Sequence, residues 1–399
     1  MNSNDFCLYL PHFRCGKKDF VRDNGKFATM NQEIIEKQKK AMASEGLDAL
    51  ISISPENVAY TAGFVVPSQS LMRWRHAICI ATPDGRVTML VIDMEETTVR
   101  AHEGIEDIRI YQEFTDDPMD KLCDALADLT LEQARIGIEM EYLPAKDFMT
   151  LKRKLPGADF VAADGIFHRL RQVKTHEELN LLRSLSKITD KAISNALTHA
   201  RVGMSEMDLA GILTRGIFEG GAENFKLMII ATGERSQYPN VGPSNRILQE
   251  GDLIRMEIFG ILNGYHAGVC RTAVVGDPTS EQENIWDNLI ECKYLVMDNI
   301  RPGANTKEIY QKFLKKFSEL GFEPISFVGH GIGLFLHEDP YLGRFGDSEL
   351  EEGMVLGIEP LVYIPGRMGL QNKDMVAVTE NEAELLSNYT QTDKLLRVG

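Results

Sequence analysis

Apolar residues recur along the chain at spacings that alternate between helix and strand from about residue 31 onward. Apolar positions between residues 34 and 42 share one helical face and predict a helix that ends near Gly46. Strands are predicted at residues 47–54, 77–81, 87–92, 108–111 and 136–139. This alternation is typical of an α/β domain, which we expect at residues 31–165, after a polar, irregular arm at residues 1–30.

A second domain is predicted over residues 176–399, with the boundary between about 160 and 176. Thr175 begins a capping sequence with Glu178 three residues later, and a long amphipathic helix follows. This half carries an internal repeat. The segment RVGMSEMDL at 201–209 is matched about one hundred residues later by RPGANTKEI, and each is followed by a strand that ends in a glutamate, Glu257 or Glu359. Two pairs in one order indicate duplication, which would place these carboxylates across a pseudo-twofold axis.

Composition narrows the possible functions. The 399 residues carry 43 Lys+Arg against 59 Asp+Glu, a formal net charge of -16. An acidic surface repels phosphate backbones and anionic lipid, so we expect neither nucleic-acid nor membrane binding. No apolar run is long enough to cross a membrane, and Pro11 and Arg14 interrupt any N-terminal signal. We therefore expect a cytoplasmic protein with reduced thiols at its six scattered cysteines: Cys7, Cys15, Cys79, Cys123, Cys270 and Cys292.

The sharpest local signal is a glycine-rich segment with two histidines. Residues 328–340 read VGHGIGLFLHEDP, with glycines on both sides of His330 and with His337 seven residues later. Flanking glycines allow a ligand or backbone to approach the imidazole closely. A glycine-rich turn with two surface histidines is the alternative.

These motifs resemble a known family. GHGIGLFLHEDP, LEEGMVLGIEP and GDLIRMEIFGILNGYHAGVCRT, in a duplicated half, are similar to the creatinase/prolidase/methionine aminopeptidase superfamily, which has the pita-bread fold. The resemblance covers about 176–390 and, more weakly, 30–165. It implies an α/β (α+β) protein, with an N-terminal domain of the creatinase/prolidase type and a C-terminal pseudo-twofold pita-bread domain. It also implies a homodimer.

The resemblance implies a two-metal centre in the family's peptidases, built from two Asp, one His and two Glu. His330 and Glu359 match that motif, and Glu257 stands at the position of the first Asp. The second Asp falls on Gly268, and the last Glu falls on Lys373. Two of the five positions therefore carry no metal ligand of the expected kind.

The charge of the site changes with these replacements. Four carboxylates require cations, but Glu257, Glu359 and Lys373 together carry a charge of only -1. Lys373 could stand where a metal stood, as a fixed positive charge between the glutamates. We therefore expect no metal or other cofactor, although a single ion on Glu257, His330 and Glu359 remains an alternative.

Creatinase is the family's precedent for a site without metal. His330, His337 and Glu359 match its residue types, and Arg344 resembles an arginine that binds a substrate carboxylate. Arg73 and Arg75 lie near an element that reaches the partner subunit's site in creatinase.

Two departures from creatinase leave the proton carrier open. Cys270 replaces a guanidinium-binding Glu, and Asn240 or a neighbour replaces the catalytic His. His266 and Cys270 share a strand face with Gly268, so His266 could act as a base and Cys270 as a nucleophile or substrate contact. The alternatives are a solvated strand-end histidine and a small buried filler. Because its motif is intact, His337 has the strongest claim to a catalytic or substrate-contacting role.

The favoured hypothesis is a creatinase-like, metal-independent hydrolase of a C–N bond in a small-molecule, amino-acid-like carboxylate substrate. Its catalytic residues would be His330, His337, Glu359, Glu257 and Lys373, and its substrate-binding residues Arg344, Arg73, Arg75, His266 and Cys270. The alternatives are an Xaa-Pro dipeptidase or aminopeptidase with an atypical metal site, a ligand-binding protein without catalysis, and a non-hydrolytic reaction such as a lyase step. Arg271 is expected to be structural and to pair with an acidic neighbour.

Overall fold

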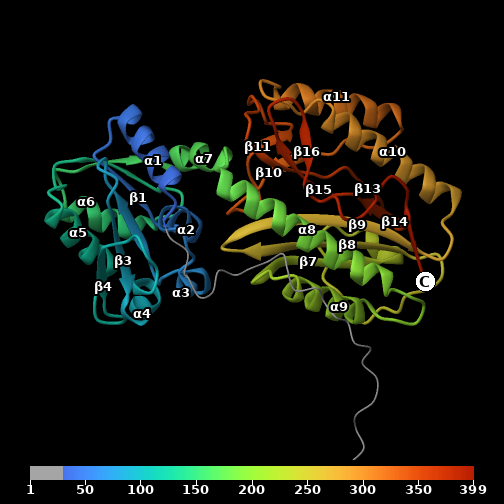
Figure 1. Cartoon of the computed structure of the whole chain (residues 1–399), viewed down its shortest axis with the longest axis horizontal. Helices are drawn as coiled ribbons and strands as arrows, with labels where there is room; N and C mark the ends of the chain where they lie inside the picture. Colours follow the sequence, from blue (N-terminus) through green and yellow to red (C-terminus); the bar gives the residue numbers. More distant parts are fainter. Residues whose placement is uncertain (1–29) are drawn as a thin grey trace, which may run out of the picture.

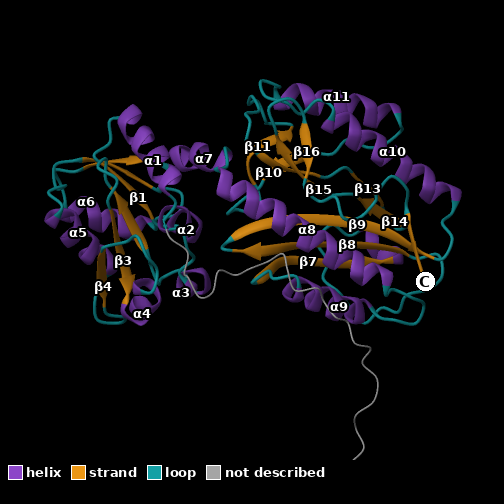
Figure 2. Ribbon diagram, viewed as in Figure 1, coloured by secondary structure: helices purple, strands orange, loops and turns teal. Residues whose placement is uncertain are grey.

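The computed structural model describes residues 30–399, so the arm predicted at 1–30 lies almost wholly outside the described residues. Figure 1 shows the N-terminal elements gathered on one side and the C-terminal elements on the other, with helix α7 (Asp164–Gln172) between them and helix α8 (His176–Thr198) running across the C-terminal strands. The cartoon coloured by secondary structure shows helices against the sheets in both parts (Figure 2). The predicted mixture of helices and strands is therefore present in each.

The N-terminal part is a six-stranded mixed sheet in the order β4-β3-β2-β1-β5-β6. Strand β2 is antiparallel to both β1 and β3, whereas the outer pairings are parallel. The strands are β1 (Ala49–Ser52), β2 (Ile78–Ala81), β3 (Val87–Ile92), β4 (Asp107–Tyr111), β5 (Arg135–Ile138) and β6 (Asp159–Ala162). The helices are α1 (Gln32–Glu45), α2 (Pro55–Ala62), α3 (Pro67–Leu71), α4 (Glu96–Arg100), α5 (Pro118–Asp128), α6 (Ala145–Lys154) and α7 (Asp164–Gln172).

Local signals set the helix ends as the sequence predicts. The side chain of Asn31 accepts the first free amides of α1, and Gly46 ends that helix in the left-handed conformation at φ 63°. Thr175 and Glu178 form the predicted capping box at the start of α8 (His176–Thr198). All five strands predicted in this half are present, with ends shifted by no more than a few residues.

The C-terminal part contains three sheets. Their orders are β17-β9-β8-β7, β11-β10-β12-β15-β16 and β13-β14. The strands are β7 (Asn224–Thr232), β8 (Leu253–Leu262), β9 (Tyr265–Val275), β10 (Phe327–Gly331), β11 (Glu338–Gly343), β12 (Val355–Ile358), β13 (Leu361–Ile364), β14 (Met368–Gln371), β15 (Asp374–Val378), β16 (Ala383–Leu385) and β17 (Leu396–Val398). The further helices are α9 (Glu206–Glu219), α10 (Ser280–Met297) and α11 (Thr306–Glu319).

The internal repeat corresponds to repeated structure. The two similar segments lead into α9 and α11, which are capped by Ser205 and Asn305. Gly203 N–H donates to Leu248 O at 3.1 Å, and Gly303 N–H donates to the equivalent Leu350 O at 2.8 Å. The same bond in both halves confirms the duplication that the sequence indicates.

The two larger C-terminal sheets are joined at one bridge. Cys270 of β9 and Lys373, just before β15, exchange both backbone hydrogen bonds at 3.1 Å. Glu257 lies in the middle of β8 and pairs with Cys270, whereas Glu359 directly follows β12. Both carboxylates meet the side chain of Lys373 at this bridge.

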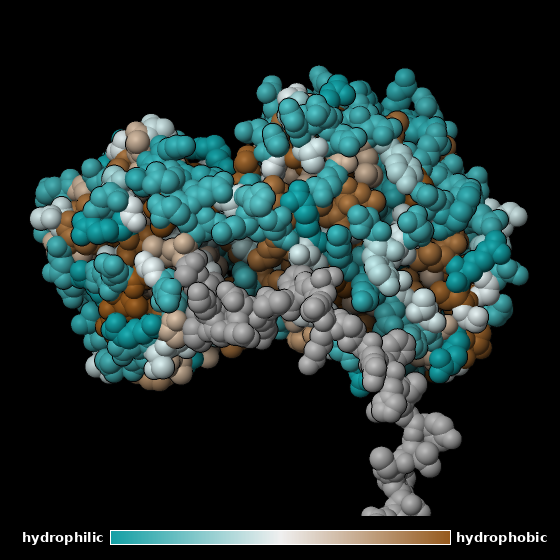
Figure 3. Space-filling view, viewed as in Figure 1, coloured by the Kyte–Doolittle hydropathy of each residue, from teal (hydrophilic) through white to brown (hydrophobic). Residues whose placement is uncertain are grey.

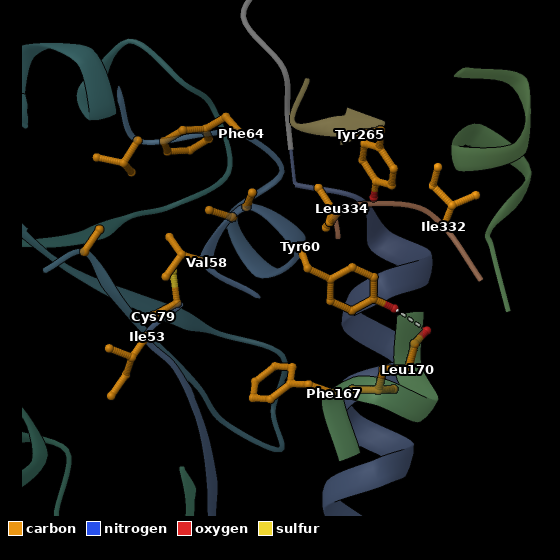
Figure 4. Close-up of a cluster of buried hydrophobic side chains, with 14 of the residues drawn as sticks. Ile53, Val58, Tyr60, Phe64, Cys79, Phe167, Leu170, Tyr265, Ile332 and Leu334 are labelled. Atoms are coloured by element: carbon orange, nitrogen blue, oxygen red, sulfur yellow. Dashed lines mark hydrogen bonds between the residues drawn. The ribbon is translucent and has the colours of Figure 1, made fainter. Parts of the chain in front are cut away.

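A continuous hydrophobic core runs from the N-terminal sheet into the C-terminal part. Figure 4 shows Tyr60 of α2 between Phe167 of α7 on one side and Leu334 and Tyr265 on the other. The Tyr60 hydroxyl donates to Leu170 O at 2.9 Å. Hydrophilic side chains cover much of the face shown in Figure 3. Among residues 30–399, no helix has the length and apolarity that a membrane span requires.

Candidate active site

Lys373 lies at the centre of a buried cluster of charged residues. Its ammonium nitrogen is 3.0 Å from Glu359 Oε2, 3.4 Å from Glu257 Oε1 and 3.0 Å from His330 Nε2. An ammonium has three N–H donors, so these three acceptors satisfy it. The lysine and both glutamates are buried. The structure thus brings together four of the residues that the sequence singled out.

The tautomer of His330 follows from its two hydrogen bonds. Nδ1 is 2.7 Å from Gly331 O, which can only accept, so Nδ1 carries the proton. Nε2 is then unprotonated and accepts a hydrogen bond from the Lys373 ammonium. Burial lowers the pKa of His330, and the Lys373 ammonium lowers it further. His330 is therefore neutral and accepts a hydrogen bond from Lys373.

His337 stacks on His330 and is the more accessible of the two rings. The ring centroids are 3.6 Å apart with an interplanar angle of 10°, and Phe327 packs edge-on against both. Burial lowers the pKa of His337 to about 3, with further contributions from His330 and Lys373. His337 is therefore neutral at physiological pH and lies on the half-buried side of the cluster.

The two glutamates of the cluster differ in electrostatics. Burial alone would raise the pKa of Glu359, but the Lys373 ammonium and His330 together outweigh burial and hold this pKa well below its usual range. For Glu257 burial wins over Lys373, and the pKa is raised. Burial acts to lower the pKa of Lys373, yet the two glutamates raise it. The ionised core of the cluster is thus the Lys373–Glu359 pair.

One oxygen in this cluster has no donor. Glu359 Oε1 is buried and has no hydrogen-bond partner among the described residues. It lies 3.4 Å from His330 Nε2, but that nitrogen accepts a hydrogen bond from Lys373 and carries no hydrogen to donate. A buried, unpaired carboxylate oxygen is costly, and this atom is an unused acceptor within the cluster.

His266 and Cys270 are held by contacts that do not suit the expected chemistry. His266 donates from Nδ1 to Gly333 O at 3.1 Å, and burial lowers its pKa to about 4. It is thus a buried histidine that fixes the glycine-rich loop, not the solvated residue considered as its alternative. Burial, and then Glu257, raise the pKa of the Cys270 thiol well above its usual value. A neutral, buried thiol fits the small-filler interpretation better than a nucleophile.

The three arginines expected to bind substrate make contacts elsewhere in this chain. Arg75 forms a bidentate pair with Glu113 at 2.8 and 3.0 Å. Arg73 lies over the Tyr142 ring, with its guanidinium carbon 5.4 Å from the ring centroid. Arg344 follows β11, is exposed, and lies over the exposed Phe345. Their predicted substrate contacts stay predictions.

The depressed pKa of His266 leads to a prediction about stability. Between pH 6.5 and 4 the unfolded chain binds a proton at this histidine and the folded chain does not, so stability falls as pH falls. This amounts to about 3 kcal/mol over the whole window. We expect H266Q to lose less thermal stability than the wild type between pH 7 and pH 4.5, as measured by circular dichroism. H199Q, at an exposed histidine, is the control and should follow the wild-type curve; an H266Q curve parallel to it would contradict the prediction.

Sequence reasoning missed two residues that shape the site. The Phe259 ring lies under Lys373, whose ammonium nitrogen is 4.5 Å from the ring centroid. Gln371 donates from Nε2 to Glu359 Oε2 at 3.3 Å. Phe259 is two residues after Glu257, and Gln371 is two before Lys373, so strand alternation places each on the face of a residue already selected. That signal could have found both.

Comparison with known proteins identifies the family. Residues 180–380 match the metallopeptidase family M24, and residues 34–173 match the creatinase/prolidase N-terminal domain. The chain belongs to the metallopeptidase family M24, a class of hydrolases, and has the pita-bread fold that the sequence resemblance predicts.

Individual relatives match between 65% and 92% of the chain. A Xaa-Pro dipeptidase from Pyrococcus furiosus is 28% identical over 372 residues, which are 92% of this chain and 99% of the relative. One from Pyrococcus horikoshii is 30% identical over 65% of this chain and 74% of its own length. The solved structure of the prolidase from Pyrococcus furiosus superimposes with a TM-score of 0.76 at 27% identity, over 88% of this chain and all of that one.

These relatives correct the order of the functional hypotheses. The replaced site residues favour a creatinase-like, metal-independent hydrolase, and that preference is wrong, because the two relatives are named Xaa-Pro dipeptidases and the matching structure is a prolidase. The preference rested on a few replaced positions, whereas the similarity extends over both domains. The Xaa-Pro dipeptidase alternative moves to first place.

The family name implies metal, and the donor set can be tested against it. Lys373 already contacts Glu257, Glu359 and His330, which are the three remaining metal-ligand types. Ligand atoms of His330, His337 and Glu359 come within 4.8 Å of one another. However, the two imidazoles lie in nearly parallel planes 3.6 Å apart, so their in-plane lone pairs cannot both point at one ion. The residues as arranged do not fit the two-metal centre, nor a single ion shared by these two rings.

Proposed function

We propose that this protein hydrolyses the C–N bond of a short peptide of the Xaa-Pro type. The similarity to Xaa-Pro dipeptidases over 92% of the chain carries the proposal. The retained site supports it, because Glu359 offers an unpaired buried oxygen beside a neutral imidazole.

In this proposal Glu359 and His337 have distinct roles. Glu359 Oε1 accepts an N–H from the N-terminal ammonium of the dipeptide, because the nitrogen of an Xaa-Pro bond carries no hydrogen, while Lys373 and Gln371 hold Oε2 in place. The His337 imidazole takes a proton from the attacking water, whose oxygen bonds to the carbonyl carbon. When the C–N bond breaks, the imidazolium returns that proton to the leaving nitrogen.

The test is proline release from Ala-Pro and Met-Pro by the purified protein, assayed with and without added Mn²⁺, with Ala-Ala as the comparison peptide. We expect proline release in at least one condition and a loss of at least about tenfold in kcat/KM for E359Q, the expected size for one charge-assisted hydrogen bond. E380Q, at an exposed loop glutamate, is the matched control and should keep wild-type activity.

Two outcomes would overturn the proposal. Absence of proline release in every condition, with calorimetry detecting dipeptide binding, would indicate a ligand-binding protein without catalysis. Hydrolysis that E359Q leaves unchanged would place the reaction away from this cluster.

The same proposal includes a cytoplasmic homodimer. The four described cysteines are free and buried, which suits a reducing compartment. Dimerisation, the use of Arg73, Arg75 or Arg344 by a partner subunit, and the absence of nucleic-acid or membrane binding stay predictions.

A further inference from the structure

The backbone of Lys373 is held in place by its own hydrogen bonds, independently of the contacts of its side chain. It lies between β14 and β15, where its N–H and C=O pair with Cys270 at 3.1 Å in each direction. The residue is 1% exposed. A backbone held on both sides directs the side chain along one path, toward Glu257 and Glu359.

Phe259 and Gly268 form one structural unit beneath that ammonium. The two residues are directly opposite each other in the pairing of β8 with β9. A Cβ built on Gly268 would lie 2.3 Å from Phe259 Cε1 and 2.6 Å from its Cδ1. The ring therefore fills the space that a side chain at position 268 would need, so Phe259 can lie there only because residue 268 is a glycine.

The ring and the lysine stabilise each other. The Lys373 ammonium nitrogen is 4.5 Å from the Phe259 ring centroid, within the range in which a cation is attracted to the aromatic face. Its three hydrogen-bond acceptors are Glu257, Glu359 and His330. The ammonium is thus surrounded by partners and needs no water.

A divalent ion would meet two obstacles in this cluster. It would have to approach carboxylates whose oxygens are already 3.0 to 3.4 Å from a positive charge, and repulsion at such distances is strong where water is excluded. Position 268 also offers it no carboxylate, because this residue is a glycine and the Phe259 ring fills the space beside it. Both obstacles come from the same three residues.

We propose that Lys373, Phe259 and Gly268 act as one set that replaces a bound metal by a covalently attached cation and excludes divalent ions from the site. This inference concerns ion binding and is tested without any assay of hydrolysis, so its failure and the failure of the proposed peptidase activity are separate results.

The experiment measures Mn²⁺ and Co²⁺ binding by calorimetry, and thermal stability with and without about 1 mM of each ion. Because a ligand that binds only the folded protein raises its melting temperature, the wild type should show no shift and no binding in the micromolar range. The triple variant F259G/G268D/K373E should bind Mn²⁺ at least about a hundredfold more tightly than the wild type. The single variant K373Q removes the charge alone and should gain about tenfold.

K293Q is the matched control. Lys293 is also 1% exposed and pairs with a buried carboxylate, Asp374, at 3.3 Å. Its loss should reduce stability without any gain in Mn²⁺ binding. Micromolar binding of Mn²⁺ or Co²⁺ by the wild type would overturn the proposal whether or not the variants fold. Folded K373Q and triple variants that bind no better than the wild type would overturn it as well.

Discussion

Replacing Arg271 with methionine is expected to lower the free energy of unfolding by about 3–5 kcal/mol. The Arg271 guanidinium contacts Asp190 at 3.0 Å and Asp374 at 2.8 Å, and all three side chains are almost fully buried. Methionine would leave two buried carboxylates without this counter-charge. It would also remove the 2.8 Å hydrogen bond that Arg271 Nη1 donates to the backbone oxygen of Lys373, which helps to hold that residue in place.

The measurement is equilibrium urea unfolding followed by tryptophan fluorescence, to which Trp286, buried in the same half of the molecule, contributes. R183M is the matched control, because Arg183 forms a bidentate pair with Glu384 that is about one-third exposed. An exposed pair of this kind contributes at most about 1 kcal/mol. Equal losses for R271M and R183M would contradict the role assigned to Arg271, and so would a midpoint unchanged from the wild type.

The approach of Glu257 and Glu359 could be predicted because each lies in a repeated segment, and the place of Lys373 beside them is what the family resemblance implies. The duplication relates the segments that contain β8 and β12, so Glu257, within β8, and Glu359, directly after β12, approach the pseudo-twofold axis together. Capping signals and apolar spacing likewise fixed α1 and α8, because those features act within a few residues along the chain. The pairing of Arg271 with acidic residues was also expected and is confirmed.

Contacts between residues that are far apart in the sequence could not be predicted in this way. Strand alternation placed His266 and Cys270 on the face of Gly268, but it does not show that Gly333 covers His266 or that Cys270 is wholly enclosed. Arg75 was expected to be free for a substrate, yet it pairs with Glu113 across 38 residues of sequence. Each of these outcomes depends on a partner far along the chain, which a local pattern does not specify.

The same distinction explains the corrected function. Family membership is distributed over two domains and survives the loss of individual ligands, whereas the ion preference of the site depends on Phe259, Gly268 and Lys373. Replacements at the metal-ligand positions therefore bear on how the site is charged. They do not decide whether the chain resembles a peptidase or a creatinase.

Replacing Gly331 with alanine is expected to cost about 3 kcal/mol of stability, the upper part of the range for overpacking, and to weaken dipeptide binding at least tenfold. Gly331 is the last residue of β10 and pairs with Glu338 of β11. A Cβ there would lie 2.2 Å from Asp339 O and 2.7 Å from Glu338 O. Both are backbone atoms, which cannot rotate aside, so the two strands must separate. His330 and His337 sit at the ends of these strands, and their 3.6 Å stack would open.

Urea unfolding gives the stability change, and calorimetry with Ala-Pro gives the affinity. Gly211 provides a control with the same substitution, because it lies within α9 and a Cβ there would meet nothing within 4 Å. G211A should stabilise the protein by about 0.5–1 kcal/mol, as alanine does for glycine inside a helix, and leave Ala-Pro affinity unchanged. If G331A loses stability but binds Ala-Pro as the wild type does, the stacked histidines do not form the peptide site. If G331A is as stable as the wild type, β10 and β11 can absorb the added methyl group and the close approach is not a constraint.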